Sequence, residues 1–512
     1  MNRGVIDKKG RDAVMAGESS QENNLDMPNG SVGTVRRILR NLTSLVFANL
    51  FDTFLRFIAY VYLARVLGRE GFGMAAFAFS TWFFFASISD FGLRMFGIRE
   101  VAKKKYPVEK YFRNIITLKI GFSIVAFIGM SLFVLVINQD AVVKHMILIY
   151  GISLLFNTLL IDWVFLGREE MHYVAIAIII RGSLACILLI SVVKGMGQIL
   201  LVPAMESLSF FSATLFLLVM YRIKIGSIKL KIDILFWKEI LPQSFPFGIS
   251  LMMIRVHSLC GIILLGLMDS NETVGLLRSA IMIPNLLNFL GLIYMDSIFP
   301  VVSRFFVSAK DKLKKLLEYS IKMSISVGLP ISVGGAFLAS SIIPMFFGPE
   351  YKDAILAFQI LIWMPFLVYL GIIYRNSLAA CNQQKYYSLI LTFRVLTAVV
   401  LSIILIPMYS RNGVAIALVS SELINLSLSY FLFYNKIYRL HFMRYLGKTI
   451  LSSVIMALFL IFFANFHPIV NILIAGALYL ITMLLVGGFT KEEFSILKTQ
   501  VLNREFKSHK PE

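Results

Sequence analysis

The chain has 512 residues, of which 58% are hydrophobic and 15% are charged, whereas soluble proteins carry about 45–50% and about 25%. A soluble protein of this composition could not cover its surface with polar groups, so most of the chain is expected to face lipid. The net charge of +20 would suit a nucleic-acid-binding protein, but a membrane protein carries such an excess in its cytoplasmic loops. The three cysteines, Cys186, Cys260 and Cys381, lie inside apolar runs, which excludes a disulfide framework.

The first 35 residues are polar and rich in Gly, Asn and Glu, so we interpret them as a disordered cytoplasmic tail, not as a signal peptide or a span. From Asn41 onward the chain divides into apolar stretches that are each long enough to cross about 30 Å of hydrocarbon. We predict fourteen spans, at residues 41–64, 72–93, 114–137, 143–165, 173–193, 198–221, 240–267, 275–300, 321–347, 354–380, 386–407, 412–435, 446–466 and 469–488.

The distribution of Lys and Arg predicts the orientation of these spans. With the N-terminus inside, and with the lysines at the ends of spans (Lys144, Lys322 and Lys448) counted with the adjacent loops, 36 of the 49 basic residues fall in cytoplasmic segments, 6 in external loops and 7 within spans. Cytoplasmic loops are the ones enriched in Lys and Arg, so both termini are expected inside, in a multi-pass protein of the cell (inner or cytoplasmic) membrane. Because every loop is short, no extramembrane catalytic domain is expected. The basic run at 310–318 is expected to form an amphipathic helix on the anionic inner leaflet.

The turns after the first and seventh spans resemble each other. They read LGREGFGMAAFA from Leu67 and LMDSNETVGLLRSA from Leu267, and each places a glycine, Gly73 or Gly275, at the start of the next span. Six spans separate the two copies, so the halves share one orientation, which indicates a parallel repeat. We therefore predict an all-α polytopic membrane protein built from a cytoplasmic tail (1–35), an N-lobe with spans 1–6 (36–222), a C-lobe with spans 7–12 (223–440), spans 13 and 14 (441–490) and a cytoplasmic C-terminal tail (491–512).

Thirteen ionisable residues fall within the predicted spans. Each costs about 2.5–3.5 kcal/mol at the centre of a helix exposed to lipid, so they need partners or water. Any single one can be a buried pair or an interface anchor, but so many together favour a polar cavity between the lobes. Two helix faces support this: Asn49, Asp52 and Arg56 share one face of span 1, where Asp52 and Arg56 can pair.

On span 8, Arg278, Asn285 and Asp296 lie nearly on one face. On span 7, Arg255 and His257 are two residues apart, so a straight helix directs them to nearly opposite sides. Asp162 and Glu206 in the N-lobe are candidates for a proton or sodium site, or alternatively make ordinary polar contacts with Asn157 or Ser209, which is the interpretation we prefer.

An ordered series of motifs resembles the bacterial polysaccharide-biosynthesis flippases of the multidrug/oligosaccharidyl-lipid/polysaccharide exporter superfamily. The series comprises LARVLGREGFGMAAFAFS from Leu63, SISDFGL from Ser87, REVAKKK from Arg99 and FGPEYKDAILAFQIL from Phe347. The resemblance implies a transporter that moves an undecaprenyl-diphosphate-linked oligosaccharide from the inner to the outer leaflet through a cationic cavity between two lobes.

On this resemblance, Arg56, Arg255, Arg278 and Arg181 would bind the diphosphate, with His257 and Asn285 as further cavity residues. Asp52, Asp162, Glu206 and Asp296 would balance charge or couple an ion. Family members often carry Asp near the middle of span 7, where this chain has His257, so the resemblance does not carry an ion-coupling role at span 7 over to this chain. The implied partners are the lipid-linked oligosaccharide, anionic membrane lipids and, as candidates, polysaccharide-assembly proteins. No cofactor, metal or nucleic acid is expected.

Two other classes compete with this interpretation. An ion-coupled exporter of drugs or metabolites from the same superfamily would usually carry cations and need an acidic cavity, whereas bases slightly outnumber acids in these spans. A polymerase or ligase of polysaccharide assembly would need a sizeable external loop for its catalytic groups, so an enzyme is not expected.

Overall fold

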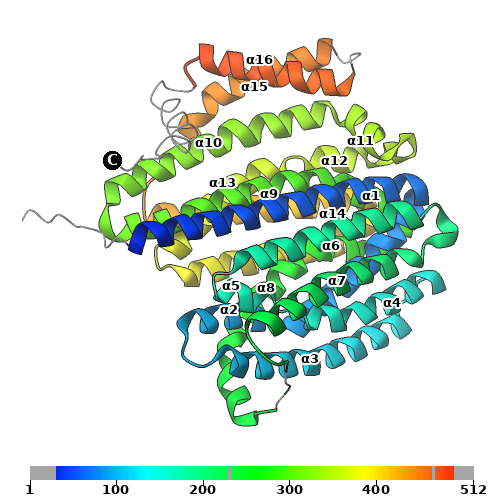
Figure 1. The fold of residues 1–512 in the computed structure, drawn as a ribbon. Coiled ribbons are helices and arrows are strands. Elements are labelled where there is room, and N and C mark those ends of the chain that lie inside the picture. The colour runs from blue at the N-terminus through cyan, green and yellow to red at the C-terminus, as the bar shows by residue number, and fades with distance from the viewer. Residues whose placement is uncertain (1–29, 229, 231, 464–466, 489–512) are drawn as a thin grey trace, which may run out of the picture.

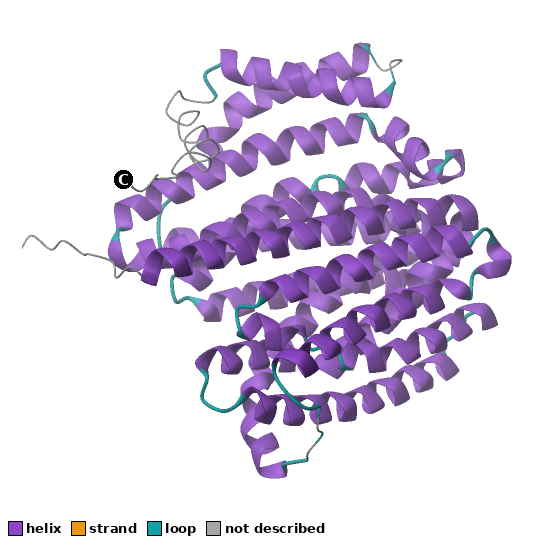
Figure 2. Cartoon of the chain, in the orientation of Figure 1, coloured by secondary structure: helices purple, strands orange, loops and turns teal. Residues whose placement is uncertain are grey.

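The computed structural model describes residues 30–488, except 229, 231 and 464–466, and every secondary-structure element in that part of the chain is a helix (Figure 2). The predicted tails lie outside the described residues, except that α1 already begins at Gly30. Twelve of the described helices are long and apolar enough to cross a membrane.

Two of these twelve helices turn back on themselves, so each contributes two apolar arms. In α1 (Gly30–Asp90) the helix is interrupted at Gly68, whose φ of 66° suits a residue without a Cβ. Asn49 and Asp90 line the same cavity, although a straight helix would hold them about 60 Å apart. In α14 (Gln384–Lys436) the break is at Ser410. The described residues thus provide the fourteen predicted crossings.

The remaining helices of the N-lobe surround the α1 hairpin, with α6 packed along α1 and α7 packed on α4 and α6 (Figure 1). A short helix, α2, occupies part of the connection that the sequence predicts to be a basic loop, and the predicted fourth span is broken into α4 and α5. The helices of the N-lobe after α1 are α2 (Leu93–Lys103), α3 (Val108–Val136), α4 (Ala141–Thr158), α5 (Asp162–Gly167), α6 (Met171–Val192), η2 (Met196–Gln198) and α7 (Leu201–Lys224).

The C-lobe helices pack around α13 and α14, which contact each other, α8 and α9. A side chain caps the N-terminus of α8 and of α9: Asp233 accepts a hydrogen bond from the Phe236 amide, and Ser270 accepts one from the Thr273 amide. The predicted ninth and tenth spans each contain breaks. Their bounds are α8 (Ile234–Met268), α9 (Asn271–Ser308), α10 (Lys310–Phe337), α11 (Ala339–Phe347), η3 (Pro349–Ala354), α12 (Ile355–Leu361) and α13 (Met364–Ala380).

The last two helices, α15 (Met443–Phe462) and α16 (Pro468–Leu485), form a pair that lies against α10 at the edge of the molecule (Figure 1). The largest hydrophobic cluster joins the two lobes, since it contains Phe77 and Trp82 of α1 together with Leu265 of α8. The basic run that begins at Lys310 is helical and continues directly into the span, with Leu313 and Leu317 buried.

Candidate functional site

A cavity of about 570 Å³ lies between the N-lobe and helices α8 and α9. Its walls come mainly from both arms of the α1 hairpin and from α6 and α7, while Leu251 and Arg255 of α8 and Arg278 of α9 complete it. The volume lies within the range of about 300–1,000 Å³ that holds small ligands. The cavity is thus a chamber of the N-lobe that the C-lobe closes with two arginines.

The cavity wall is strongly cationic. Six of the lining side chains carry a positive charge, namely Arg56, Arg94, Lys119, Arg181, Arg255 and Arg278. Among the described residues that line it, only Asp90 and Asp162 are acidic. Four predicted site arginines, at 56, 181, 255 and 278, therefore lie around one chamber, together with Asp162.

Asp52 holds two of these arginines in place from behind the wall. Its Oδ2 atom lies 3.1 Å from Arg56 Nε and 3.0 Å from Arg181 Nη2. The first contact is the pair expected from their spacing on span 1, whereas the second comes from α6, 129 residues away. One carboxylate shared by two guanidinium groups leaves this pair of arginines with a net positive charge.

Two further cations of the wall were not among the predicted site residues. Arg94 Nη2 lies 2.7 Å from Asp162 Oδ2, and the negative charge of Asp162 raises the pKa of Arg94. Lys119 is almost fully buried, with Nζ 3.0 Å from Asp90 Oδ1. In the sequence, Arg94 is one of several basic residues of a predicted cytoplasmic loop. The SISDFGL motif just before it was the available signal, because the backbone turns there with positive φ at Phe91 and Gly92.

Arg255 and Arg278 differ from the other cations because, among the described residues, no carboxylate oxygen lies within 4.0 Å of either side chain. Each lies over an aromatic ring instead. Arg255 Cζ is 4.3 Å from the centroid of Phe83, and Arg278 Cζ is 5.3 Å from the centroid of Tyr60. Aromatic faces attract cations without neutralising their charge, so both guanidinium groups retain a full charge for a ligand.

Glu206 lies outside the cavity wall, in the interior of the N-lobe, where it is 1% exposed. Its two oxygens accept hydrogen bonds from the tyrosines of neighbouring helices, at 2.8 Å from Tyr60 and 2.6 Å from Tyr150. Ser209 donates to the Glu206 backbone carbonyl, not to the carboxylate. The Tyr60 side chain thus joins a buried carboxylate on one side to Arg278 on the other.

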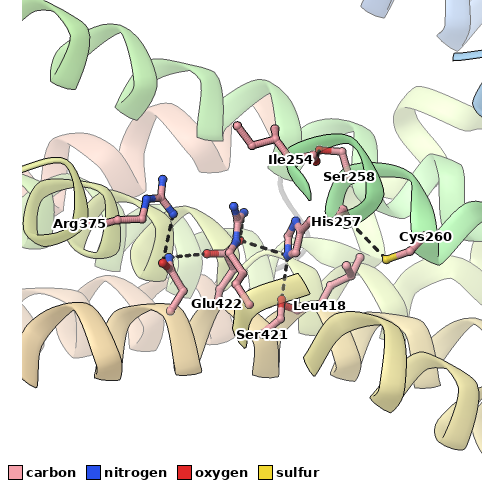
Figure 3. Close-up of polar contacts among 10 residues, drawn as sticks. Ile254, His257, Ser258, Cys260, Arg375, Leu418, Ser421 and Glu422 are labelled. Carbon is pink, nitrogen blue, oxygen red and sulfur yellow. Dashed lines mark hydrogen bonds and ion pairs between the residues drawn. The ribbon is translucent and has the colours of Figure 1, made fainter. Parts of the chain in front are cut away.

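His257 does not line the cavity, in agreement with its spacing of two residues from Arg255. It lies in the C-lobe beside Ser421 and Glu422 (Figure 3). Its Nε2 atom is 2.9 Å from Ser421 Oγ and 3.7 Å from Glu422, and Arg394 Nε donates to the same carboxylate at 2.8 Å. Figure 3 shows this network continuing to Arg375. The network joins α8, α13 and both arms of α14 within the C-lobe.

The remaining two predicted residues, Asn285 and Asp296, are exposed on α9 and do not line the cavity. Both residues follow Arg278 on α9, so the helix face that they share with Arg278 extends beyond the end of the cavity. Asp296 makes no ion pair with Arg278.

The end of the cavity that is predicted to be external is closed by direct backbone contact between the lobes. A Cβ added to Gly73 would lie 1.7 Å from the Asn271 carbonyl oxygen, and one added to Gly275 would lie 1.9 Å from that of Arg69. The two glycines at equivalent places in the predicted repeat therefore meet each other. Arg69 adds ion pairs across this contact, at 3.0 Å to Glu272 and 3.2 Å to Asp353. We call this contact the glycine seal.

Comparison with known proteins adds to this geometry. Residues 38–306, more than half of the chain, match the family model described as polysaccharide biosynthesis protein. The chain belongs to this family. A family relative from Escherichia coli (strain K12), named "Putative O-antigen transporter", is 25% identical over 397 residues, which cover 76% of this chain and 95% of that protein.

Two solved structures have the same fold as this family member. One is the lipid II flippase MurJ in an inward closed conformation, with a TM-score of 0.72, 17% identity and coverage of 90% of this chain and 99% of that one. The other is an inward-facing MATE family multidrug resistance transporter of the MOP superfamily, with a TM-score of 0.61, 14% identity and coverage of 75% and 94%. The protein is thus a multi-pass membrane protein with the fold of these transporters.

Proposed function

We propose that the protein is a flippase that moves a polyprenyl-diphosphate-linked oligosaccharide across the cytoplasmic membrane by alternating access, for the synthesis of a surface polysaccharide. The family assignment and the relative named as an O-antigen transporter support this cargo. The observation that carries the proposal is the pair of arginines, Arg255 and Arg278, which face the cavity and have no carboxylate partner among the described residues.

The charge of the wall suits a diphosphate. Its six cations meet three carboxylates, Asp52, Asp90 and Asp162, so an excess of positive charge remains. Arginine presents a planar fork of donors that matches phosphate oxygens, and a charged head group that enters hydrocarbon without such partners loses its hydration at a high free-energy cost. The arginines replace part of that hydration.

The chamber also suits a lipid-linked cargo, whose polar head group and apolar tail need different surroundings. About 570 Å³ provides room for a diphosphate with attached sugar, while the polyprenyl chain stays in lipid. The protein does no covalent chemistry in this proposal. It supplies binding, shielding from lipid and a change in the side from which the chamber is open.

The test measures binding and flipping by the full-length protein in proteoliposomes with a fluorescent undecaprenyl-diphosphate-linked glycan. Loss of one hydrogen-bonded charge weakens binding by about 1.5–3 kcal/mol, so Arg255→Gln and Arg278→Gln should each lower affinity by about ten-fold or more. Arg304→Gln, which removes an exposed charge from the same helix as Arg278, is the control.

Flipping at the normal rate by both cavity variants, at normal membrane abundance, would contradict the proposal. The alternative, an ion-coupled exporter of small molecules, draws on the likeness to the MATE fold. It predicts tight binding of cationic drugs, and binding that tightens when Arg255 is neutralised would favour it.

A further inference from the structure

A second pocket lies at the opposite edge of the C-lobe, where the first turns of α10 face the connection between α14 and α15. Its volume is about 190 Å³. Its polar wall consists of Lys314 and Glu318 of α10, Arg439 and His441 of the connection, and Arg444 of α15. We call it the interfacial pocket.

The charges of this wall are not balanced. Three permanent cations, Lys314, Arg439 and Arg444, face a single carboxylate, Glu318, and within the part of the chain that the structure describes none of the four takes part in an ion pair. By contrast, Lys105 in the connection between α2 and α3 is paired with Glu239 at 3.2 Å. Three like charges around one small space repel each other unless an anion lies between them.

The pocket is held open by contacts that do not involve its charged groups. Tyr438 donates a hydrogen bond to the Lys310 carbonyl at 3.2 Å, which ties the connection to the first turn of α10. Leu440 is 3% exposed and belongs to the hydrophobic cluster of the C-lobe. Phe442 packs edge-on against Tyr430, with ring centroids 5.3 Å apart. The backbone that carries Arg439 and Arg444 is therefore fixed before any ligand binds.

The position of the interfacial pocket along the membrane-spanning helices indicates which kind of ligand reaches it. Both α10 and α15 are long and apolar enough to cross the membrane, and the pocket lies at the first turns of both. At this level α15 exposes Met443, and further along the span it exposes Ile450 and Leu451. A ligand with its charged end in the pocket would thus have its apolar part beside a lipid-facing helix.

We propose that the interfacial pocket binds the phosphate of an anionic phospholipid head group from the leaflet that it faces, with the acyl chains along α15. Basic pockets between membrane-spanning helices on the cytoplasmic side bind such head groups. The site would hold the pair α15–α16 against α10, the helix of the C-lobe on which that pair packs.

The test compares phosphatidylglycerol with phosphatidylcholine of the same acyl chains, added to the full-length protein in a neutral detergent. Native mass spectrometry gives the dissociation constant, and thermal unfolding gives an independent measure of binding. Each basic residue near the surface contributes about a fivefold gain in affinity for anionic lipid, so Lys314→Gln/Arg444→Gln should weaken phosphatidylglycerol binding by about 25-fold.

The control is Lys312→Gln/Lys385→Gln, which removes the same charge from exposed positions on α10 and α14 outside the pocket. Because neither lysine lines the pocket, its affinity for phosphatidylglycerol should fall clearly less than that of the pocket variant. Equal loss in the two double variants, or equal affinity for phosphatidylcholine, would overturn the proposal. So would full competition by inorganic phosphate, which would indicate a free-anion site, or binding of undecaprenyl diphosphate in place of phosphatidylglycerol, which would assign the pocket to the cargo.

Discussion

The glycine seal allows a sharp test of how the external end of the cavity closes. Gly73→Ala adds one methyl group, which would lie 1.7 Å from the Asn271 carbonyl oxygen and 2.8 Å from the Gly275 amide nitrogen. Because Cβ atoms essentially never come within 3.0 Å of a backbone atom, α1 and α9 have to separate by at least 1.3 Å at this point. Both obstacles are backbone atoms, so no side-chain rotation relieves them.

The free-energy consequence follows from overpacking a tight contact, which costs about 1–3 kcal/mol. The cost falls on conformations in which the seal is closed and vanishes once the lobes part there. The equilibrium between closed and externally open forms should therefore shift by a factor of about 5 to 150 toward the open form. Gly275→Ala should act in the same direction, because its Cβ would lie 1.9 Å from the Arg69 carbonyl oxygen.

Accessibility of the cavity measures this shift. In a chain whose three cysteines are replaced, Ala86→Cys places a thiol in the cavity wall, and a membrane-impermeant maleimide added from outside reports its exposure. Gly121→Ala is the matched control, since a Cβ there meets no atom within 4 Å. Labelling of the Gly73→Ala protein no faster than that of the control, at equal membrane abundance, would refute the account of the seal.

Three further outcomes are expected. Asp52→Asn leaves the guanidinium groups of Arg56 and Arg181 facing each other without their shared carboxylate, so it should lower the free energy of unfolding by about 3–5 kcal/mol. Thermal unfolding of Asp52→Asn, alone and combined with Arg181→Gln, measures this. A double variant that is no more stable than Asp52→Asn would contradict the explanation. Tyr150→Phe removes one of the two donors to Glu206 and should destabilise by about 1–3 kcal/mol; a melting temperature within error of the parent protein would count against that role. Burial acts to raise the pKa of Glu100, but hydrogen bonds from its basic neighbours outweigh burial and the pKa is lowered. The stabilising effect of the Glu100 carboxylate should thus be present above the unfolded-state pKa, about 4.3, and be lost as pH falls through the lower folded-state value. In Glu100→Gln the melting temperature should therefore fall less steeply with pH in that range. An unchanged pH profile of the melting temperature would refute this.

Much of the architecture could be read from the sequence because it depends on local periodicity and on transfer free energy. Apolar stretches of sufficient length predict the fourteen crossings. The described residues contain an apolar helical segment at each of these places, and two pairs of segments are joined into α1 and α14. The breaks within the predicted fourth, ninth and tenth spans were missed because hydropathy averages over a window and does not respond to a local change of backbone direction.

Contacts between residues of one helix could also be predicted from the sequence. The pair Asp52–Arg56 follows from a separation of four residues, and the opposite directions of Arg255 and His257 follow from a separation of two. By contrast, nothing along the chain indicated that Asp52 would also bind Arg181.

The sequence by itself determined that this protein lies in a membrane, how many times it crosses and which charges have to be accommodated there, because each of these depends on composition along a single helix. The tertiary structure decided which of those charges meet. Arg255 and Arg278 lie in the chamber over aromatic rings, with no carboxylate partner in the described part of the chain, whereas Glu206 binds two tyrosines and His257 joins a network in the C-lobe. The physical reason is that pairing between helices depends on how each is rotated and packed against its neighbours, and the spacing of residues along one helix does not contain that information.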